Sequence, residues 1–143
     1  MSDKSTVTVR VSRCFNQSAE RVFDAWLDPA RAGKFLFATA TGRMVRAQID
    51  ARVGGKFVFT DRRDGEDVEH TGEYFEIDRP RRLVFTFAVP KYSKDVTRVI
   101  VETVPAGEAC DLTLTHDGVY PEYASRTESG WAGILEGLAA SLS

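Results

Sequence analysis

The last part of the chain, residues 120–142, constrains the fold most, because its apolar residues repeat with the period of an α-helix. Side chains three or four positions apart share one face of a helix, and the charged residues of this segment fall on the other face. Pro121 suits the first helical position, where its missing N–H costs nothing. Gly130, Gly133 and Gly137 indicate that this helix either packs closely at those points or leaves open space there. The predicted buried face consists of Tyr123, Thr127, Trp131, Ile134, Leu135, Leu138, Ala139 and Leu142.

Most of the chain before this helix has the residue alternation of strands, with two short helices near its start. Valines at every second position from Val7 onward, separated by polar residues, are typical of a half-buried strand. Asp28, followed by proline, predicts the cap of the second short helix. Asp64 and Gly65 form a strong hairpin signal. The predicted strands cover residues 7–15, 44–50, 56–61, 69–77, 83–87, 96–104 and 109–116.

The order of these elements predicts one sheet around one long helix. Six consecutive strands joined by short turns favour an antiparallel meander, and the first strand can pair with the last. We therefore expect a single α+β domain over residues 1–143, in which a curved seven-stranded antiparallel sheet wraps around the C-terminal helix. A cavity is expected wherever the side chains of the helix and of the concave sheet face do not meet.

The charge balance and the lack of long apolar runs exclude several classes of partner. Lys and Arg total 19 against 21 Asp and Glu, so no basic field attracts nucleic acid. No apolar run approaches the roughly 20 residues that span a bilayer, and the N-terminus has no apolar signal core. We therefore predict a cytoplasmic protein with neither a nucleic-acid nor a membrane partner.

The cysteines, histidines and acidic residues do not form a recognisable metal or cofactor site. Cys14 and Cys110 lie far apart without metal-ligand spacing and are interpreted as reduced thiols. The charged run over residues 61–69 does not follow the order of ligands in a calcium loop, and we interpret it as a solvated hairpin tip. His70, beside it, is predicted to be exposed. No metal and no cofactor are expected.

Several segments together resemble a known family, the Hsp90-ATPase-activator-like branch of the SRPBCC superfamily, with its helix-grip (START/Bet v1-like) fold. The resemblance spans nearly the whole chain in the family's order. It implies the fold, whereas the superfamily uses one cavity for many different tasks. The segments that carry it are VFDAWLDP at 22–29, DARVGGKF at 50–57, GEY at 72–74, PRRLVF at 80–85 and Gly130-Trp131.

The chain also departs from the family pattern. Phe35 and Phe37 occupy a region where the family often has a tryptophan, so we expect a different cavity mouth. The co-chaperone that names the family carries an additional N-terminal domain, whereas only six residues precede the first strand here, so chaperone activation is not carried over. The motif at residues 52–55 is interpreted as a structural turn, because its two glycines permit a bulge and no phosphate-binding spacing is present.

Aromatic residues from four strands and the last helix form the candidate binding site. In the helix-grip arrangement these side chains either converge on a cavity for an apolar molecule or pack as ordinary core. Tyr74, His116, Tyr123 and Arg46 would supply polar contacts to a ligand. The predicted ligand-binding residues are Phe35, Phe37, Met44, Phe57, Phe59, Tyr74, Phe85, Phe87, His116, Tyr123, Trp131 and Leu135.

His116 is the one candidate for acid–base chemistry. It shares strand parity with Leu112 and Leu114, which directs it toward the cavity. A histidine on an apolar face is commonly a hydrogen-bonded core residue, although histidine is also the usual general base. No partner has the sequence spacing of a catalytic triad, and the sequence leaves open whether any reaction is catalysed.

These observations favour one function and leave two others open. The leading hypothesis is a module that binds a hydrophobic, aromatic or lipid-like small molecule between the sheet and the C-terminal helix. The alternatives are an enzyme of the polyketide cyclase or hydrolase type with His116 as acid or base, and a chaperone-interacting module. A chaperone partner and a homodimer also remain open.

Overall fold

The computed structural model describes residues 5–36, 42–92 and 94–142, and it confirms the predicted order of elements. A single turn of 3-10 helix, which the sequence did not distinguish from the long helix, precedes that helix. The elements are β1 (Val7–Phe15), α1 (Ala19–Ala25), α2 (Pro29–Phe35), β2 (Arg43–Ile49), β3 (Lys56–Arg63), β4 (Glu66–Asp78), β5 (Arg82–Phe87), β6 (Thr97–Ala106), β7 (Ala109–Val119), η1 (Pro121–Tyr123) and α3 (Ala124–Ser141).

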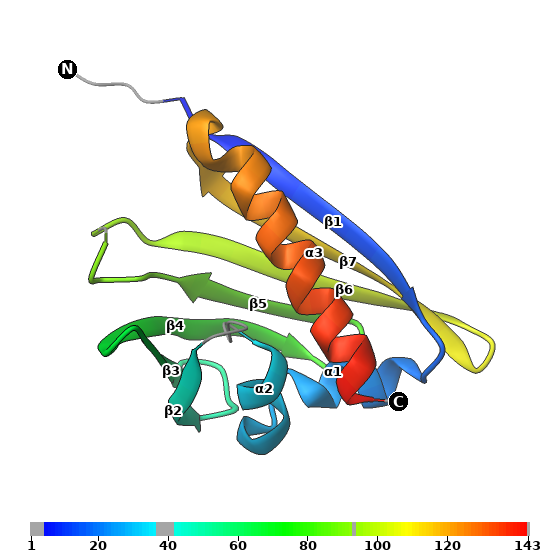
Figure 1. The fold of residues 1–143 in the computed structure, drawn as a ribbon. Coiled ribbons are helices and arrows are strands. Elements are labelled where there is room, and N and C mark those ends of the chain that lie inside the picture. Colours follow the sequence, from blue (N-terminus) through cyan, green and yellow to red (C-terminus); the bar gives the residue numbers. More distant parts are fainter. Residues whose placement is uncertain (1–4, 37–41, 93, 143) are drawn as a thin grey trace.

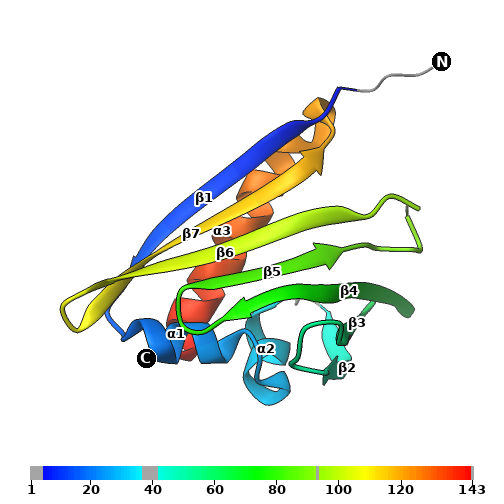
Figure 2. The same ribbon diagram turned by 180° about the vertical axis from the view of Figure 1, so that it is seen from behind.

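All seven strands form one antiparallel sheet, as predicted. The strand order is β1-β7-β6-β5-β4-β3-β2, so the first strand pairs with the last and the others follow as a meander. The helix α3 runs diagonally across the concave face of this curved sheet (Figure 1). Seen from behind, the sheet lies in front of α3 (Figure 2). This arrangement confirms the α+β helix-grip fold.

Two turns with unusual backbone geometry shape the sheet. Asp64 and Gly65 both have positive φ, 49° and 80°, which matches the tight turn expected between β3 and β4. Within the glycine pair at residues 54–55, a Cβ on Gly55 would lie 2.1 Å from the carbonyl oxygen of Asp50. The same pair exchanges two backbone hydrogen bonds with Tyr74 on β4. The glycine-containing motif at residues 52–55 is therefore a turn that backbone hydrogen bonds hold against β4.

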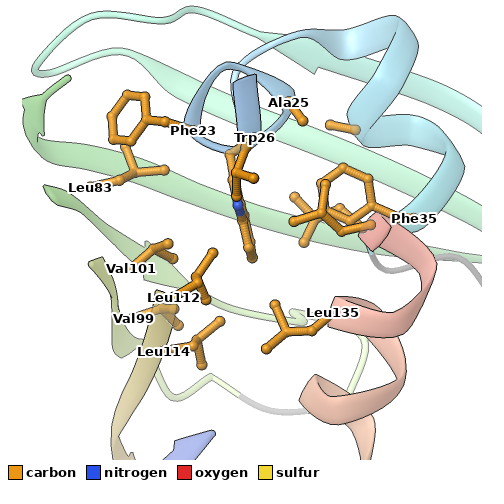
Figure 3. Packing of buried hydrophobic residues seen from close by; sticks show 14 of the residues in the cluster. Phe23, Ala25, Trp26, Phe35, Leu83, Val99, Val101, Leu112, Leu114 and Leu135 are labelled. Carbon is orange, nitrogen blue, oxygen red and sulfur yellow. The ribbon is translucent and has the colours of Figure 1, made fainter. Parts of the chain in front are cut away.

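One end of the space between sheet and helix is filled by a packed core. Ser18 and Asp28 cap α1 and α2 with their side chains, as the sequence indicated for Asp28. Trp26, following α1, meets Phe35 of α2 edge to face at 5.5 Å between ring centroids. Figure 3 shows Trp26 and Leu135 amid the inward side chains of the strands. The C-terminal half of α3, with α1 and α2 beside it, therefore closes this end (Figures 1 and 2).

The other end of the concave face lies under η1 and the first turns of α3, and its inward residues on β6 and β7 include polar ones. Leu112 and Leu114 on β7 are followed at the next inward position by His116. On β6, Val99 lies opposite His116, and the next inward position toward this end is Thr97. The inner faces of β6 and β7 thus become polar at this end, whereas β5 places Phe87 there. The candidate site lies at this end.

Candidate functional site

A first chamber, here called the tyrosine chamber, opens between the ends of β5–β7, the segment that follows β5, and the start of α3. Its volume is about 610 Å³. That volume lies within the range of small-molecule pockets. Three tyrosines belong to its wall, and Tyr123 at its mouth is 50% exposed. The wall consists of Phe87, Ala88, Val89, Tyr92, Asp95, Thr97, His116, Gly118, Val119, Tyr120, Glu122, Tyr123, Arg126 and Thr127.

A second chamber, here called the histidine chamber, lies beside the first one along α3. Its volume is about 290 Å³, and it shares Phe87, His116 and Thr127 with the tyrosine chamber. A Cβ added at Gly130 would meet nothing within 4 Å, because this glycine faces open space. The two chambers are therefore adjacent, and together they are called the cleft between sheet and helix. The wall of the histidine chamber consists of Arg63, His70, Phe87, His116, Thr127, Gly130, Trp131 and Ile134.

His116, in the wall of both chambers, has both ring nitrogens engaged in hydrogen bonds. The indole N–H of Trp131 donates to Nδ1 at 2.9 Å, so Nδ1 must accept and the ring proton sits on Nε2. Nε2 then donates to Thr97 Oγ1 at 2.7 Å, and that hydroxyl donates onward to the carbonyl oxygen of Phe87 at 3.2 Å. Burial lowers the pKa of His116 to about 4. The ring is therefore neutral at pH 7 and links α3 to β5, β6 and β7.

His70, on β4, is buried and not exposed as the sequence analysis predicted. Its side chain is 6% exposed, because it lies opposite Phe59 in the β3–β4 pairing and shares that residue's inward face. Its Nδ1 donates to the Phe59 carbonyl oxygen at 3.3 Å, and its Nε2 lies 3.4 Å from Arg63 Nη2. Burial lowers its pKa to about 4. Its ring stacks on that of Phe87 with the centroids 6.0 Å apart.

The interpretation of residues 61–69 as a solvated tip is wrong for Asp61 and Arg63. Asp61 has a fully buried side chain, and its Oδ2 accepts a hydrogen bond from Arg63 Nε at 2.8 Å. Arg62 and Asp67, by contrast, form a half-exposed ion pair at 2.7 Å, as expected for a hairpin tip. Strand parity explains the difference, because Asp61 and Arg63 continue the inward series that begins at residue 57.

The structure brings four of the predicted ligand-binding residues to the cleft: Phe87, His116, Tyr123 and Trp131. Phe37 lies outside the described residues. Arg46, proposed as a polar contact, is exposed on β2 and donates to Gln48. The remaining predicted residues belong to the packed core or lie against it: Phe35, Met44, Phe57, Phe59, Tyr74, Phe85 and Leu135.

Packing explains the position of the core group. The rings of Phe57, Tyr74 and Phe85 contact one another, with centroids 5.4 to 6.3 Å apart, and they fill the inner face where α1 and α2 cover it. Burial also raises the pKa of the Tyr74 phenol. These side chains therefore stabilise the fold beside the cleft, and their predicted contact with a ligand has no support from their position.

The ligand-binding residues predicted from the sequence do not include six residues of the cleft wall: Arg63, His70, Tyr92, Thr97, Tyr120 and Thr127. The strand residues among them carried a usable signal. Arg63 and Thr97 have the same parity as the inward aromatic and aliphatic residues of their strands. The cross-strand register that places His70 opposite Phe59 follows from the two-residue turn between β3 and β4.

Metal-binding groups and membrane-spanning helices are not apparent in the part of the chain that the structure describes. Within residues 5–36, 42–92 and 94–142, no group of three or more His, Cys, Asp or Glu side chains is placed to hold a metal ion. Among the same residues, no helix is both long and apolar enough to cross a bilayer. A further hollow of about 500 Å³ lies between the end of β1 and the C-terminal part of α3, and its wall is more polar than that of the cleft. The cleft carries the functional argument because its wall is mainly apolar.

Solved structures share this fold over nearly their whole length. A protein from Rhizobium loti is 28% identical, with a TM-score of 0.80 over 96% of this chain and 97% of its own. One from Chromobacterium violaceum is 24% identical, with a TM-score of 0.82 over 93% and 94%. A Staphylococcus aureus protein of unknown function is 15% identical, with a TM-score of 0.86 over 97% and 94%. The two less similar proteins establish the likeness in fold alone.

Comparison at the level of sequence families gives a more specific result. A search of curated proteins finds none that matches this chain. Residues 16–143, however, match the family described as "Activator of Hsp90 ATPase homolog 1-like protein". That match takes in every element from α1 to α3. The chain therefore belongs to the Activator of Hsp90 ATPase homolog 1-like family.

Proposed function

We propose that this protein binds a small molecule with an apolar or aromatic body in the cleft between β5–β7 and the first turns of α3. The observation that carries the proposal is that the tyrosine and histidine chambers lie side by side and share the wall residues Phe87, His116 and Thr127. The fold of the family supports a ligand-binding cavity in general. The cytoplasmic location and the single-domain organisation remain predictions of the sequence.

The chemistry of the shared wall favours a ligand with an apolar body. His116 and Thr97 satisfy one another's hydrogen bonds, so these polar groups are engaged with the protein. The rings of Phe87, His116 and Trp131 meet edge to face, with centroids 5.8 to 6.3 Å apart. Such a wall offers ring faces and edges, which contact a planar or aliphatic group by dispersion and burial of apolar surface.

The geometry weighs against His116 as a general acid or base. A general base must reach the substrate proton with a nitrogen lone pair, whereas the Nδ1 lone pair here accepts from Trp131. The cyclase or hydrolase hypothesis therefore requires the Trp131 hydrogen bond to break first. A chaperone-interacting role also remains a hypothesis, and the ATPase rate of Hsp90 with and without this protein would test it.

The first test of the binding proposal is native mass spectrometry of the freshly purified protein, compared with its denatured mass. We expect an added mass that disappears on denaturation, or, for a protein purified empty, a rise in melting temperature with an apolar aromatic compound. Absence of both across a panel of aromatic and lipid-like compounds would count against the proposal.

Two matched variants localise the binding to the cleft. Gly130→Leu places a side chain in the histidine chamber, whereas Gly133→Leu places the same side chain in open space outside both chambers. We expect the first variant to lose binding and the second to retain it, with similar melting temperatures for both. Equal binding by the two variants would place the ligand elsewhere.

A further inference from the structure

We propose that the ligand carries an anionic group, and that Arg63 in the wall of the histidine chamber receives it. The inference rests on the proposed function and adds the chemical class of the ligand, an apolar or aromatic acid. It starts from the position of one guanidinium group on the inner face of β3.

Two contacts hold Arg63 in place, one with Asp61 outside the chamber wall and one with His70 within it. Its Nε donates to Oδ2 of Asp61 at 2.8 Å, and its Nη2 lies 3.4 Å from Nε2 of His70. The Asp61 side chain is fully buried, whereas that of Arg63 is 29% exposed. A ligand in the chamber therefore meets the cation, and the carboxylate lies behind it. A fixed guanidinium is suited to a planar carboxylate or a sulfonate, because its donors have a rigid geometry.

The two histidines in this wall do not compete for the ligand's anionic group. His116 uses both nitrogens within the network to Trp131 and Thr97. His70 donates from Nδ1 to the Phe59 carbonyl oxygen, so its proton faces the strand β3. Among the described residues of this wall, Arg63 is the one with a formal charge at pH 7.

The charged side chains in the wall of the tyrosine chamber are mostly acidic, and this difference between the chambers predicts the orientation of the ligand. Its wall contains the carboxylates Asp95 and Glu122 together with one guanidinium, Arg126. An anionic group at this end would lie near two negative charges, whereas at the other end it meets Arg63. We therefore place the acidic end of the ligand in the histidine chamber, and its apolar body along Phe87 toward the tyrosines.

Two fluorescent probes with the same aromatic body separate this inference from the proposed function. The probe 1-anilinonaphthalene-8-sulfonate carries a sulfonate, and N-phenyl-1-naphthylamine lacks it. For the native protein we expect both probes to bind. The sulfonate probe should bind at least about tenfold more tightly, because a charge-assisted hydrogen bond changes the affinity by about that factor. If the neutral probe binds and the sulfonate is no tighter, the inference fails alone. If neither binds, the proposed function fails as well.

Two variants test whether Arg63 causes the difference in affinity between the two probes. The double variant Asp61→Asn/Arg63→Gln removes both members of the buried ion pair, because loss of Arg63 alone would leave a buried carboxylate without this partner. Arg62→Gln is the control, since Arg62 is the neighbouring guanidinium and pairs with Asp67 at the surface. Circular dichroism checks that all variants are folded.

We expect the double variant to lose at least about tenfold in affinity for the sulfonate probe and to bind the neutral probe as before. Arg62→Gln should leave both affinities unchanged. An equal loss for the two probes, or an unchanged preference for the sulfonate in the double variant, would overturn the assignment to Arg63.

Discussion

His116 is the residue whose role changes most between sequence and structure. As a lone histidine with inward parity, it was a candidate acid or base. In the structure it joins α3 to three strands through Trp131 and Thr97. A neutral histidine with one accepting and one donating nitrogen suits this position, and few other side chains have that combination.

The network predicts that His116→Ala destabilises the protein strongly. The substitution removes the acceptor of the buried Trp131 N–H and leaves a cavity, so we expect a loss of about 3 kcal/mol in the free energy of unfolding. Urea unfolding followed by fluorescence measures it. Thr113→Ala, at a position on β7 whose hydroxyl contacts Ser12 at the surface, is the control and should change stability by less than about 0.5 kcal/mol. A small loss for His116→Ala would reopen the acid–base hypothesis.

The two buried histidines predict how stability depends on pH. Burial lowers the pKa of both His70 and His116 from 6.5 to about 4. Between these values the unfolded chain binds protons that the folded protein does not, so stability is complete above about pH 6.5 and decreases as the pH falls toward 4. Each histidine contributes on the order of 3 kcal/mol across this window.

Urea midpoints measured from pH 7.5 to pH 4 would test this dependence. His70→Asn and His116→Asn should each reduce the slope by about half. The carboxylates of Asp24 and Asp67, whose pKa values are lowered by Arg79 and Arg62, reduce stability only at still lower pH, where they become protonated. A native protein whose midpoint is constant down to pH 4.5 would show that the histidines do not titrate as described.

At the scale of elements, α3 has two different halves. The sequence allowed either close packing or open space at its three glycines, and the structure contains both. A Cβ at Gly130 or Gly133 would meet nothing within 4 Å, whereas one at Gly137 would lie 3.3 Å from Cβ of Phe35 on α2. The C-terminal half therefore packs against α2, and the N-terminal half borders the cleft.

This difference predicts opposite effects of one substitution within the same helix. Gly133→Ala should stabilise the protein by about 1 kcal/mol, because alanine favours the helix and its methyl group meets open space. Gly137→Ala should gain nothing or lose stability, because Phe35 must shift to admit the methyl group. The melting temperatures of the two variants test this prediction. An equal gain in stability for both would mean that α3 and α2 are loosely packed.

At the scale of the whole molecule, the pairing of the first and last strands determines the state of the cysteines. In the β1–β7 register Phe15 lies opposite Cys110 and Cys14 opposite Asp111. Neighbouring residues of a strand point to opposite faces, so Cys110 is buried in the core and Cys14 lies on the exposed face. The structure therefore agrees with the interpretation of two separate thiols.

We accordingly expect the melting temperature to be the same with and without a reducing agent. Labelling under denaturing, non-reducing conditions should modify both cysteines, and labelling of the native protein should modify Cys14 alone. Modification of Cys110 together with Cys14 in the native state, or a reductant-dependent melting temperature, would contradict this arrangement of the sheet.

The sequence by itself determined the elements, their order and most of the faces they bury. Alternation and helical periodicity are local properties, so they placed the seven strands, the two short helices and the apolar face of α3 within a few residues of their observed bounds. The antiparallel meander followed from the short connections between six consecutive strands, and the same order allowed the first strand to pair with the last.

Only the tertiary structure decided which inward residues line an open space. A cavity is a mismatch between surfaces contributed by distant segments, and periodicity cannot measure that mismatch. Thus Phe57 and Phe87 have equivalent patterns, yet the first is buried in the core cluster, and the second lies in the wall of the cleft. The same reason applies to Arg63 and His70. Their inward position follows from strand parity and register, and their place in a chamber wall depends on where α3 leaves the sheet uncovered.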